Sequence, residues 1–367
     1  MPMPTTSYRV DTGSPGSCNL NLTIRTFDLR LRHTFTISRG SSDVVSVLVA
    51  ALRRDGITAY GETSPYGYYG QDLESVRRDL ESIAPWFEEQ DPFQFRLVLE
   101  EARRRLGKNT QALCALDLSL HDWVGKRLGV PIYQLFGLRG SDLPPTTYTI
   151  GIDSIETMVE KLREFPGFPI YKIKLGTDRD IDIVRALRNV TDAAFRVDAN
   201  CAWTPEQTIE VSKELAKLNV EYIEQPMPPE RLEEMEDVYA KSALPLVADE
   251  NSVLPEDVPN LRRRFHGINI KLVKCGGLQP ALQMIALART FGMKIMIGCM
   301  IESSNLCTAA AHLGSLVDYL DLDGPLLIGN DPFDGMKIDR GVITLSEEAG
   351  LGAKLLRTQQ SRESSYA

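Results

Sequence analysis

The chain has 367 residues, of which 43% are hydrophobic and 25% charged, an ordinary composition for a globular protein long enough to hold two domains. Its 50 acidic residues outnumber its 41 lysines and arginines, and the net charge of −9 argues against nucleic acids and anionic membranes, which attract basic surfaces. An anionic small substrate is not excluded, because a bound metal ion or a few local cations can reverse the field within one pocket.

Residues 1–17 are rich in Ser, Thr, Pro and Gly and lack the apolar stretch of a secretory signal, so we expect a flexible arm there. No apolar run reaches the roughly 18 residues of a membrane span. The six cysteines form no Cys-x-x-Cys pair and the four histidines no His-x-His pattern. We therefore expect reduced cysteines in a cytoplasmic protein, without disulfides or zinc. The oligomeric state is left open, a homo-oligomer included.

The region from residue 18 to residue 140 predicts an α+β domain. Two strand-like segments come first, at 21–35 and 44–63, and an Asp-Gly pair at 55–56 indicates a hairpin turn. Three helix-like segments follow, at 72–88, 95–106 and 109–128. A segment rich in Gly and Pro then marks the boundary with the next domain.

Residues 141–326 alternate between short apolar runs and helical stretches. The runs recur at intervals of roughly 25 residues, which is typical of β–α units in a parallel sheet. They lie at 147–152, 170–175, 195–200, 221–225, 245–250, 268–273, 294–299 and 319–323. Because no Gly-x-Gly-x-x-Gly follows the first run, an open nucleotide-binding sheet is disfavoured. We predict an α/β fold, a (β/α)₇β TIM-like barrel whose tail, 327–367, returns to the first, capping domain.

Acidic residues stand at the ends of three successive predicted strands: Asp198, Glu224 and Asp249. Their spacing of about 25 residues gives them equivalent positions at the C-terminal end of the barrel, where active sites lie. One such acid alone would more often cap a helix or pair with a base. Three carboxylates together repel one another unless a cation neutralises them, and a set of oxygen ligands favours Mg²⁺. The pattern therefore predicts one Mg²⁺ site.

Lysines occupy positions in the barrel mouth where aliphatic residues would be the default. Lys172 and Lys174 share one face of the second strand, and Lys271 ends the sixth, on the opposite side of an eight-stranded barrel. One lysine could simply pair with an acid, but three fit that interpretation poorly. Burial and a nearby Mg²⁺ should lower the pKa of a lysine toward the range of a general base. A metal-stabilised enediolate formed by one lysine and reprotonated by the other would give racemisation or epimerisation.

The motifs YKIKLG, VDAN, EQP, ADE, NIKLVKCGG and MIES resemble the muconate-lactonizing-enzyme subgroup of the enolase superfamily, over residues 145–330. The resemblance implies one Mg²⁺ per subunit, held by the three acids, and a pair of acid/base lysines. By this resemblance the ligands are Asp198, Glu224 and Asp249, the catalysts are Lys174 and Lys271, and Lys172 and Glu302 lie on the substrate-binding side.

The eighth predicted strand carries Asp321 and Asp323 on one face. Alone, two such acids would more readily cap a helix or face solvent. Here the motif is similar to that of dipeptide epimerases of the L-Ala-D/L-Glu type, in which it receives the α-ammonium group of the substrate. The resemblance thus implies a Mg²⁺-dependent epimerase, an isomerase that inverts the α-carbon of the C-terminal residue of a dipeptide.

Other members of the same superfamily remain as alternatives. An o-succinylbenzoate synthase, an N-acylamino-acid racemase or a muconate cycloisomerase has no obvious need for Asp321 and Asp323, since their substrates lack a free amine. A non-catalytic binding relative would not need both the three acids and the lysines.

Selection of the substrate side chain is expected in the capping domain, whose loops at 35–42 and 64–70 should cover the barrel mouth. Arg39 either pairs with an acidic substrate side chain, as a capping arginine does in some relatives, or lies at the surface. The tyrosines of the second loop could instead line an apolar pocket; they are Tyr66, Tyr68 and Tyr69.

Overall fold

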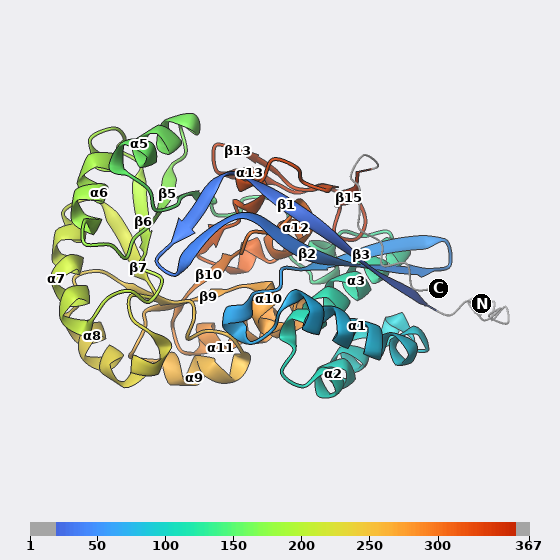
Figure 1. The fold of residues 1–367 in the computed structure, drawn as a ribbon. Coiled ribbons are helices and arrows are strands. Elements are labelled where there is room, and N and C mark those ends of the chain that lie inside the picture. Colours follow the sequence, from blue (N-terminus) through green and yellow to red (C-terminus); the bar gives the residue numbers. More distant parts are fainter. Residues whose placement is uncertain (1–19, 357–367) are drawn as a thin grey trace, which may run out of the picture.

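The computed structural model describes residues 20–356 and arranges them as a capping region beside a barrel (Figure 1). The expected flexible arm, 1–17, and the end of the expected tail, 357–367, lie outside the described residues. None of the described helices combines the length and apolarity needed to cross a membrane.

The capping region contains a three-stranded antiparallel sheet followed by helices, as predicted. The strands are β1 (Asn21–Ile37), β2 (Gly40–Arg54) and β3 (Ile57–Thr63), and the helices are α1 (Leu73–Glu88), α2 (Phe95–Leu106), α3 (Thr110–Leu128) and α4 (Ile132–Leu135). The predicted hairpin turn is confirmed, since Asp55 and Gly56 join β2 to β3 with φ values of 53° and 74°. Positive φ at both central residues matches the right-handed twist of the strands.

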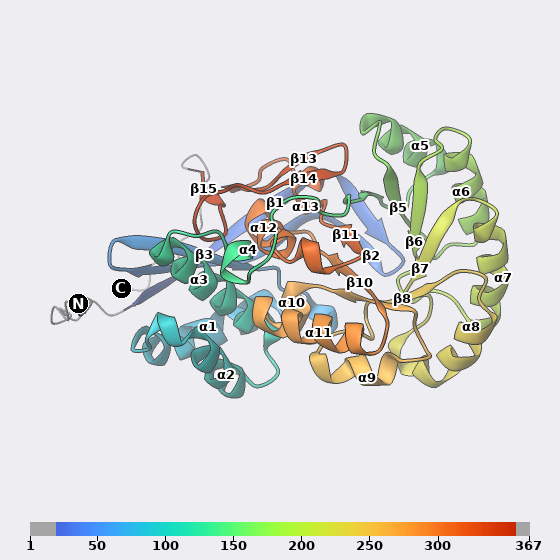
Figure 2. The same cartoon turned by 180° about the vertical axis from the view of Figure 1, so that it is seen from behind.

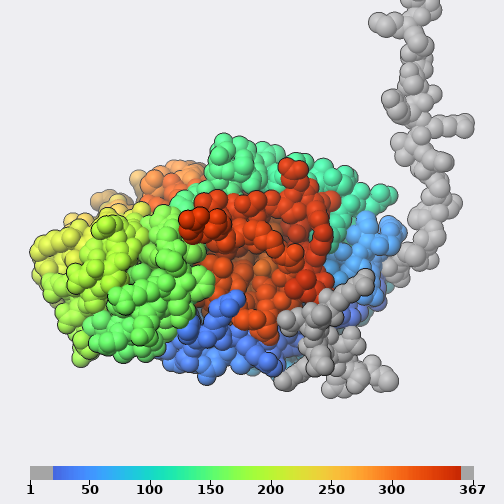
Figure 3. Space-filling view, turned by 90° about the horizontal axis from the view of Figure 1, so that it is seen from above, coloured from blue at the N-terminus to red at the C-terminus, as the bar shows by residue number. Residues whose placement is uncertain are grey.

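Both faces of the capping sheet are covered, because side chains on a strand alternate between faces. Leu48, Ala50 and Leu52 pack with the helices α1 to α3. On the opposite face, Val47 and Val49 pack with C-terminal residues, namely Ile328, Phe333 and Ala353. Figure 3 shows this C-terminal segment, in red, in contact with both the barrel and the capping region. Its short strands are β12 (Phe333–Asp334), β13 (Lys337–Asp339), β14 (Val342–Thr344) and β15 (Lys354–Leu355).

The predicted barrel is confirmed as a sheet of eight parallel strands in sequence order, from β4 to β11. The strands are β4 (Tyr148–Ile150), β5 (Ile170–Lys174), β6 (Ala194–Asp198), β7 (Val220–Glu224), β8 (Leu246–Ala248), β9 (Gly267–Ile270), β10 (Lys294–Gly298) and β11 (Tyr319–Asp321). A parallel bridge between Thr146 and Leu320 brings the first and last strands together. Each predicted apolar run overlaps one of these strands.

Helices surround this sheet on the outside, as Figures 1 and 2 show from opposite sides. The helices of this part of the chain, including short ones at the barrel mouth, are α5 (Ile155–Glu164), α6 (Asp180–Arg188), α7 (Pro205–Ala216), α8 (Met235–Lys241), α9 (Val258–Leu261), α10 (Leu272–Cys275), α11 (Leu278–Thr290), α12 (Ser304–Ala311) and α13 (Gly324–Leu327). Local sequence explains where they begin. At α7, the Thr204 side chain accepts from the backbone of Gln207, whose side chain accepts in return, and Pro205 occupies the first turn.

The capping region is fastened over the C-terminal ends of the barrel strands. Ile152 donates its backbone N–H to the Thr36 carbonyl at 2.9 Å, and the Ser38 hydroxyl donates to the Asn200 carbonyl at 2.8 Å. Farther along, the buried Glu62 carboxylate of β3 accepts from the backbone and hydroxyl of Ser303, after β10. The loop between β1 and β2 therefore lies above the barrel mouth.

Candidate active site

The three acids predicted as metal ligands come together at the barrel mouth. Asp198 ends β6 and Glu224 ends β7, and the two residues are direct partners in the sheet. Asp249 follows β8, and one oxygen of each carboxylate lies within 4.8 Å of the others. All three side chains are buried.

This cluster fits a hard divalent cation. Burial raises the pKa of Glu224 to about 7, and the charge of Asp198 adds to the shift, because neighbouring carboxylates repel. Glu224 Oε2 forms no hydrogen bond, and its close partner is the Lys172 ammonium at 2.7 Å. These buried oxygens repel one another, and Glu224 Oε2 has no hydrogen bond. Such a set of oxygen ligands is suited to Mg²⁺.

Neighbouring side-chain and backbone groups hold each of the three acids. Asn269 donates to Glu224 Oε1 at 2.8 Å, and the backbone N–H of Asn200 donates to Asp198 Oδ1 at 2.9 Å. Lys274 Nζ lies 2.5 Å from Asp249 Oδ1. These supporting contacts fix the orientation of the three carboxylates.

Sequence reasoning missed Lys274 as a residue of this site. In the structure Lys274 is buried in the short helix α10. This helix begins directly after Lys271, which follows β9. Both lysines contact Asp249, because one helical turn brings residues three apart to the same side. The Lys-x-x-Lys spacing is the signal that could have revealed this contact.

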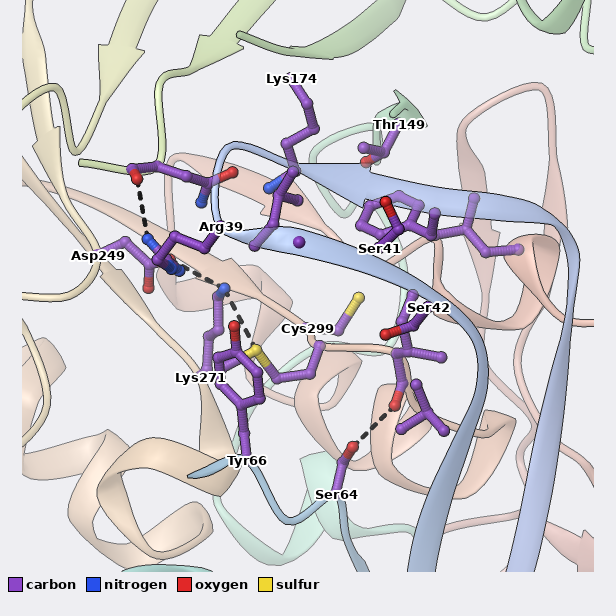
Figure 4. Close-up of a pocket in the computed structure, with 18 of the residues that line it drawn as sticks. Arg39, Ser41, Ser42, Ser64, Tyr66, Thr149, Lys174, Asp249, Lys271 and Cys299 are labelled. Carbon is purple, nitrogen blue, oxygen red and sulfur yellow. Dashed lines mark hydrogen bonds and ion pairs between the residues drawn. The ribbon is translucent and has the colours of Figure 1, made fainter. Parts of the chain in front are cut away.

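The three predicted lysines also reach the acid cluster. We call these lysines, together with Asp198, Glu224 and Asp249, the barrel floor. Lys172 Nζ lies between the carboxylates of Asp198, Glu224 and Asp321, at 3.3, 2.7 and 2.8 Å. Lys174 Nζ is 2.7 Å from Asp198, its neighbour across the β5–β6 pair. Lys271 Nζ is 3.0 Å from Asp249. Figure 4 shows Lys174 and Lys271 extending toward each other from opposite sides of the cavity.

Burial and neighbouring carboxylates act in opposite directions on the pKa of a buried lysine. Burial alone lowers the pKa of Lys271, but the adjacent Asp249 carboxylate more than reverses the effect and the pKa is raised. The pKa of Lys172 is raised in the same way, chiefly by Asp321. Neighbouring carboxylates therefore oppose the effect of burial on these lysines.

Asp321 and Asp323 lie on the wall of the same cavity but in different surroundings. Asp321 accepts from the Thr147 hydroxyl and pairs with Lys172. Asp323 accepts from the backbone N–H of Thr149 at 2.5 Å and, among the described residues, has no basic partner within ion-pair distance. Burial, together with the charge of Asp321, raises the pKa of Asp323 to about 7.

The cavity has a volume of about 540 Å³, within the range of small-molecule sites. From the predicted site residues, the lining includes Arg39, Lys172, Lys174, Asp249, Lys271, Asp321 and Asp323. Glu302 does not line it. Its Oε1 instead accepts a hydrogen bond from the backbone N–H of Met300 at 2.9 Å.

Arg39 lines the cavity and is paired within the protein. Its guanidinium lies 2.7 Å from the buried Glu250 carboxylate, donates to the Asn200 carbonyl at 2.9 Å and stacks on Tyr68. Tyr66 and Tyr69 line the cavity, whereas Tyr68 lies behind Arg39. Sequence reasoning missed Glu250, although it directly follows a predicted metal ligand.

Comparisons with known proteins agree with this geometry. Residues 21–137 match the mandelate racemase / muconate lactonizing enzyme N-terminal domain, and residues 155–359 match the enolase C-terminal domain-like family. The chain is 43% identical over 340 residues to an L-Ala-D/L-amino acid epimerase from a Maribacter species, covering 92% of this chain and 99% of the relative. It is 40% identical to an L-Ala-D/L-Glu epimerase from Bacteroides thetaiotaomicron, covering 91% and 87%.

A solved structure has the same architecture. It is a dipeptide epimerase from Cytophaga hutchinsonii complexed with Mg and the dipeptide D-Ala-L-Val. The TM-score is 0.88 at 25% sequence identity, and the match covers 94% of this chain and 98% of the other.

Proposed function

Because the chain belongs to the mandelate racemase / muconate lactonizing enzyme family of the enolase superfamily, we propose that it is a Mg²⁺-dependent dipeptide epimerase. It inverts the α-carbon of the C-terminal residue of a dipeptide. The observation that carries this proposal is a single cavity lined by two opposed lysines, a second pair of acids and Asp249, which belongs to the acid cluster suited to Mg²⁺.

In this proposal Asp198, Glu224 and Asp249 hold Mg²⁺. The bound ion supplies positive charge beside the substrate carboxylate, where negative charge gathers as the α-proton leaves. Lys172 forms ion pairs with Asp198, Glu224 and Asp321. It therefore orients these acids on the side of the barrel floor that receives the substrate carboxylate.

Lys174 and Lys271 move the proton. Inversion requires that a proton leave one face of the α-carbon and that another arrive on the opposite face, so each face needs its own acid/base group. One lysine acts as a neutral amine and the other as an ammonium, and their roles exchange with the configuration of the substrate. Their approach from β5 and from the end of β9 supports this assignment.

Asp321 and Asp323 receive the α-ammonium group of the dipeptide. Asp323 has no cationic partner within ion-pair distance among the described residues. The α-ammonium group of the substrate would supply that partner. Substrates that lack a free amine would leave Asp323 unpaired, and this disfavours N-acylamino-acid racemase, o-succinylbenzoate synthase and muconate cycloisomerase activities.

Two further assignments are part of the proposal. The domain borders are a capping domain at 18–140, a barrel at 141–326 and a tail from 327 that completes the cap, which the packing of Phe333 and Ala353 on the capping sheet supports. A cytoplasmic location is supported by the five described cysteines, all of which are free.

The activity is tested by incubating the protein with Mg²⁺ and a library of L,L-dipeptides in D₂O. We expect a gain of one deuterium at the C-terminal α-carbon, detected by mass spectrometry, with the L,D product resolved by chromatography. A metal-stripped sample serves as the control. Absence of exchange across the whole library would contradict the proposal.

A further inference from the structure

The substituents of the reacting carbon have separate destinations in the cavity. When the α-proton leaves, the carbon becomes planar, with the carboxylate, the amide nitrogen and the side chain in one plane. In the proposed function, the carboxylate lies toward Asp249 and its partners, and the amide leads to the ammonium held by Asp321 and Asp323. Lys174 and Lys271 occupy the two faces. The side chain is left with one direction, away from the barrel floor and toward the capping domain.

The capping side of the cavity is mainly apolar. Six of its side chains form what we call the capping wall, and they are Phe35, Ile37, Val44, Val45, Tyr66 and Leu73. Ser41, Ser42, Ser46 and Ser64 lie between them. Of the described capping residues that line the cavity, one has a charged side chain, Arg39.

The charge of Arg39 is already neutralised within the protein. Its Nη2 lies 2.7 Å from Glu250, whose side chain is 1% exposed, and its Nη1 donates to the Asn200 carbonyl. A substrate carboxylate near Arg39 would have to displace Glu250 and would leave that acid buried without a partner. Such a loss is costly for a buried charge.

We propose that the enzyme selects dipeptides whose C-terminal residue has an apolar side chain, and that Glu250 excludes acidic side chains by occupying Arg39. This inference rests on the proposed epimerase activity. An apolar side chain gains by contact with the capping wall, whereas an acidic one would be buried there without a free cation.

The first test is a competition between L-Ala-L-Leu and L-Ala-L-Glu in one D₂O reaction. The ratio of their exchange rates gives the ratio of kcat/KM, which does not depend on how much protein is folded or metal-loaded. We expect a preference for L-Ala-L-Leu of about tenfold or more. Equal or faster exchange of L-Ala-L-Glu would overturn the inference and leave the proposed activity standing. Absence of exchange with either dipeptide, with the wider library also inert, would instead refute the activity.

The second test changes the occupancy of Arg39. Glu250→Gln should release the charge of Arg39 and shift the ratio toward L-Ala-L-Glu by about tenfold. An unchanged ratio in an active variant would overturn the role of Glu250.

A third variant decides the matter if Glu250→Gln, which is next to Asp249, has no measurable turnover. Val44→Lys places an unpaired cation on the capping wall and should raise the share of L-Ala-L-Glu. The matched control is Val342→Lys, at an exposed site on β14 outside the cavity, which should leave the ratio as in the unaltered protein. If Val44→Lys also leaves the ratio unchanged, the side chain does not meet the capping wall and the inference fails.

Discussion

The barrel floor and the capping wall face the same cavity but treat charge differently. On the floor, carboxylates and ammonium groups crowd within hydrogen-bond distance, and Glu224 Oε2 still forms no hydrogen bond. Beside the wall, Arg39 is the one charged side chain among the described capping residues that line the cavity, and Glu250 matches its charge. A region that keeps charge available can perform proton transfer, whereas a region that cancels its charge can select a substrate by shape and apolar contact. The predictions below test that division, beginning with the largest effect.

Removing either lysine of the pair should abolish epimerisation, by about 10³-fold or more, because each serves one face of the α-carbon. Lys174→Ala and Lys271→Ala should each still exchange the α-proton of one substrate configuration, and the two variants should prefer opposite configurations. Deuterium uptake from L,L- and L,D-dipeptides measures this.

Lys213→Ala, at an exposed site on α7, is the control and should behave as the unaltered protein. Normal epimerisation by either active-site variant would show that the floor does not work through two bases.

Replacing both acids of the eighth strand should reduce kcat/KM for dipeptides by about a hundredfold, because the α-ammonium loses its buried partners. Asp321→Asn with Asp323→Asn tests this by exchange kinetics. The ratio of kcat/KM for a free dipeptide to that for its N-acetylated form should also decrease in the double variant. If the double variant kept that discrimination, the ammonium would be bound elsewhere.

The pH profile should separate the two acids. Because burial raises the pKa of Asp323 to about 7, this group becomes protonated below that pH and attracts the ammonium less. We expect kcat/KM to decline as the pH falls through about 7, and Asp323→Asn to remove this decline. A profile that keeps the same acidic limb in the variant would assign it to another group.

The smallest effect concerns the joint between the capping domain and the barrel. Burial raises the pKa of Glu62 from 4.5 to about 8, so the folded state holds a proton that the unfolded state releases. The free energy of unfolding should therefore decrease as the pH rises from about 4.5 to about 8. Denaturant titrations at several pH values should show a flatter profile for Glu62→Gln. An equally steep decrease in this variant would rule out Glu62 as its source.

The barrel and the acid cluster could be predicted because their signals are local and periodic. Each strand carries its apolar run, and Asp198, Glu224 and Asp249 fall in phase with that repeat, so one rule places all three. The capping hairpin could also be predicted from the sequence, since Asp55 and Gly56 favour the turn by themselves.

Other features depend on contacts that no local pattern encodes. The Arg39–Glu250 pair joins the capping domain to the end of β8, and nothing near either residue indicates the other. The orientation of the Glu302 side chain is set by the loop after β10, where its carboxylate accepts a hydrogen bond from the backbone N–H of Met300. The pKa of Lys271 depends on the balance between burial and its carboxylate neighbour, and a sequence indicates both effects without their relative size.

The packing of C-terminal residues on the capping sheet has a consequence for biosynthesis. Val47 and Val49 are made early, but Ile328, Phe333 and Ala353, which cover them, follow the whole barrel. One apolar face of the sheet therefore stays uncovered on the ribosome until translation is almost complete, a condition that favours aggregation or the binding of a chaperone. A messenger truncated after the barrel would yield a chain with every proposed catalytic group and an unfinished cap.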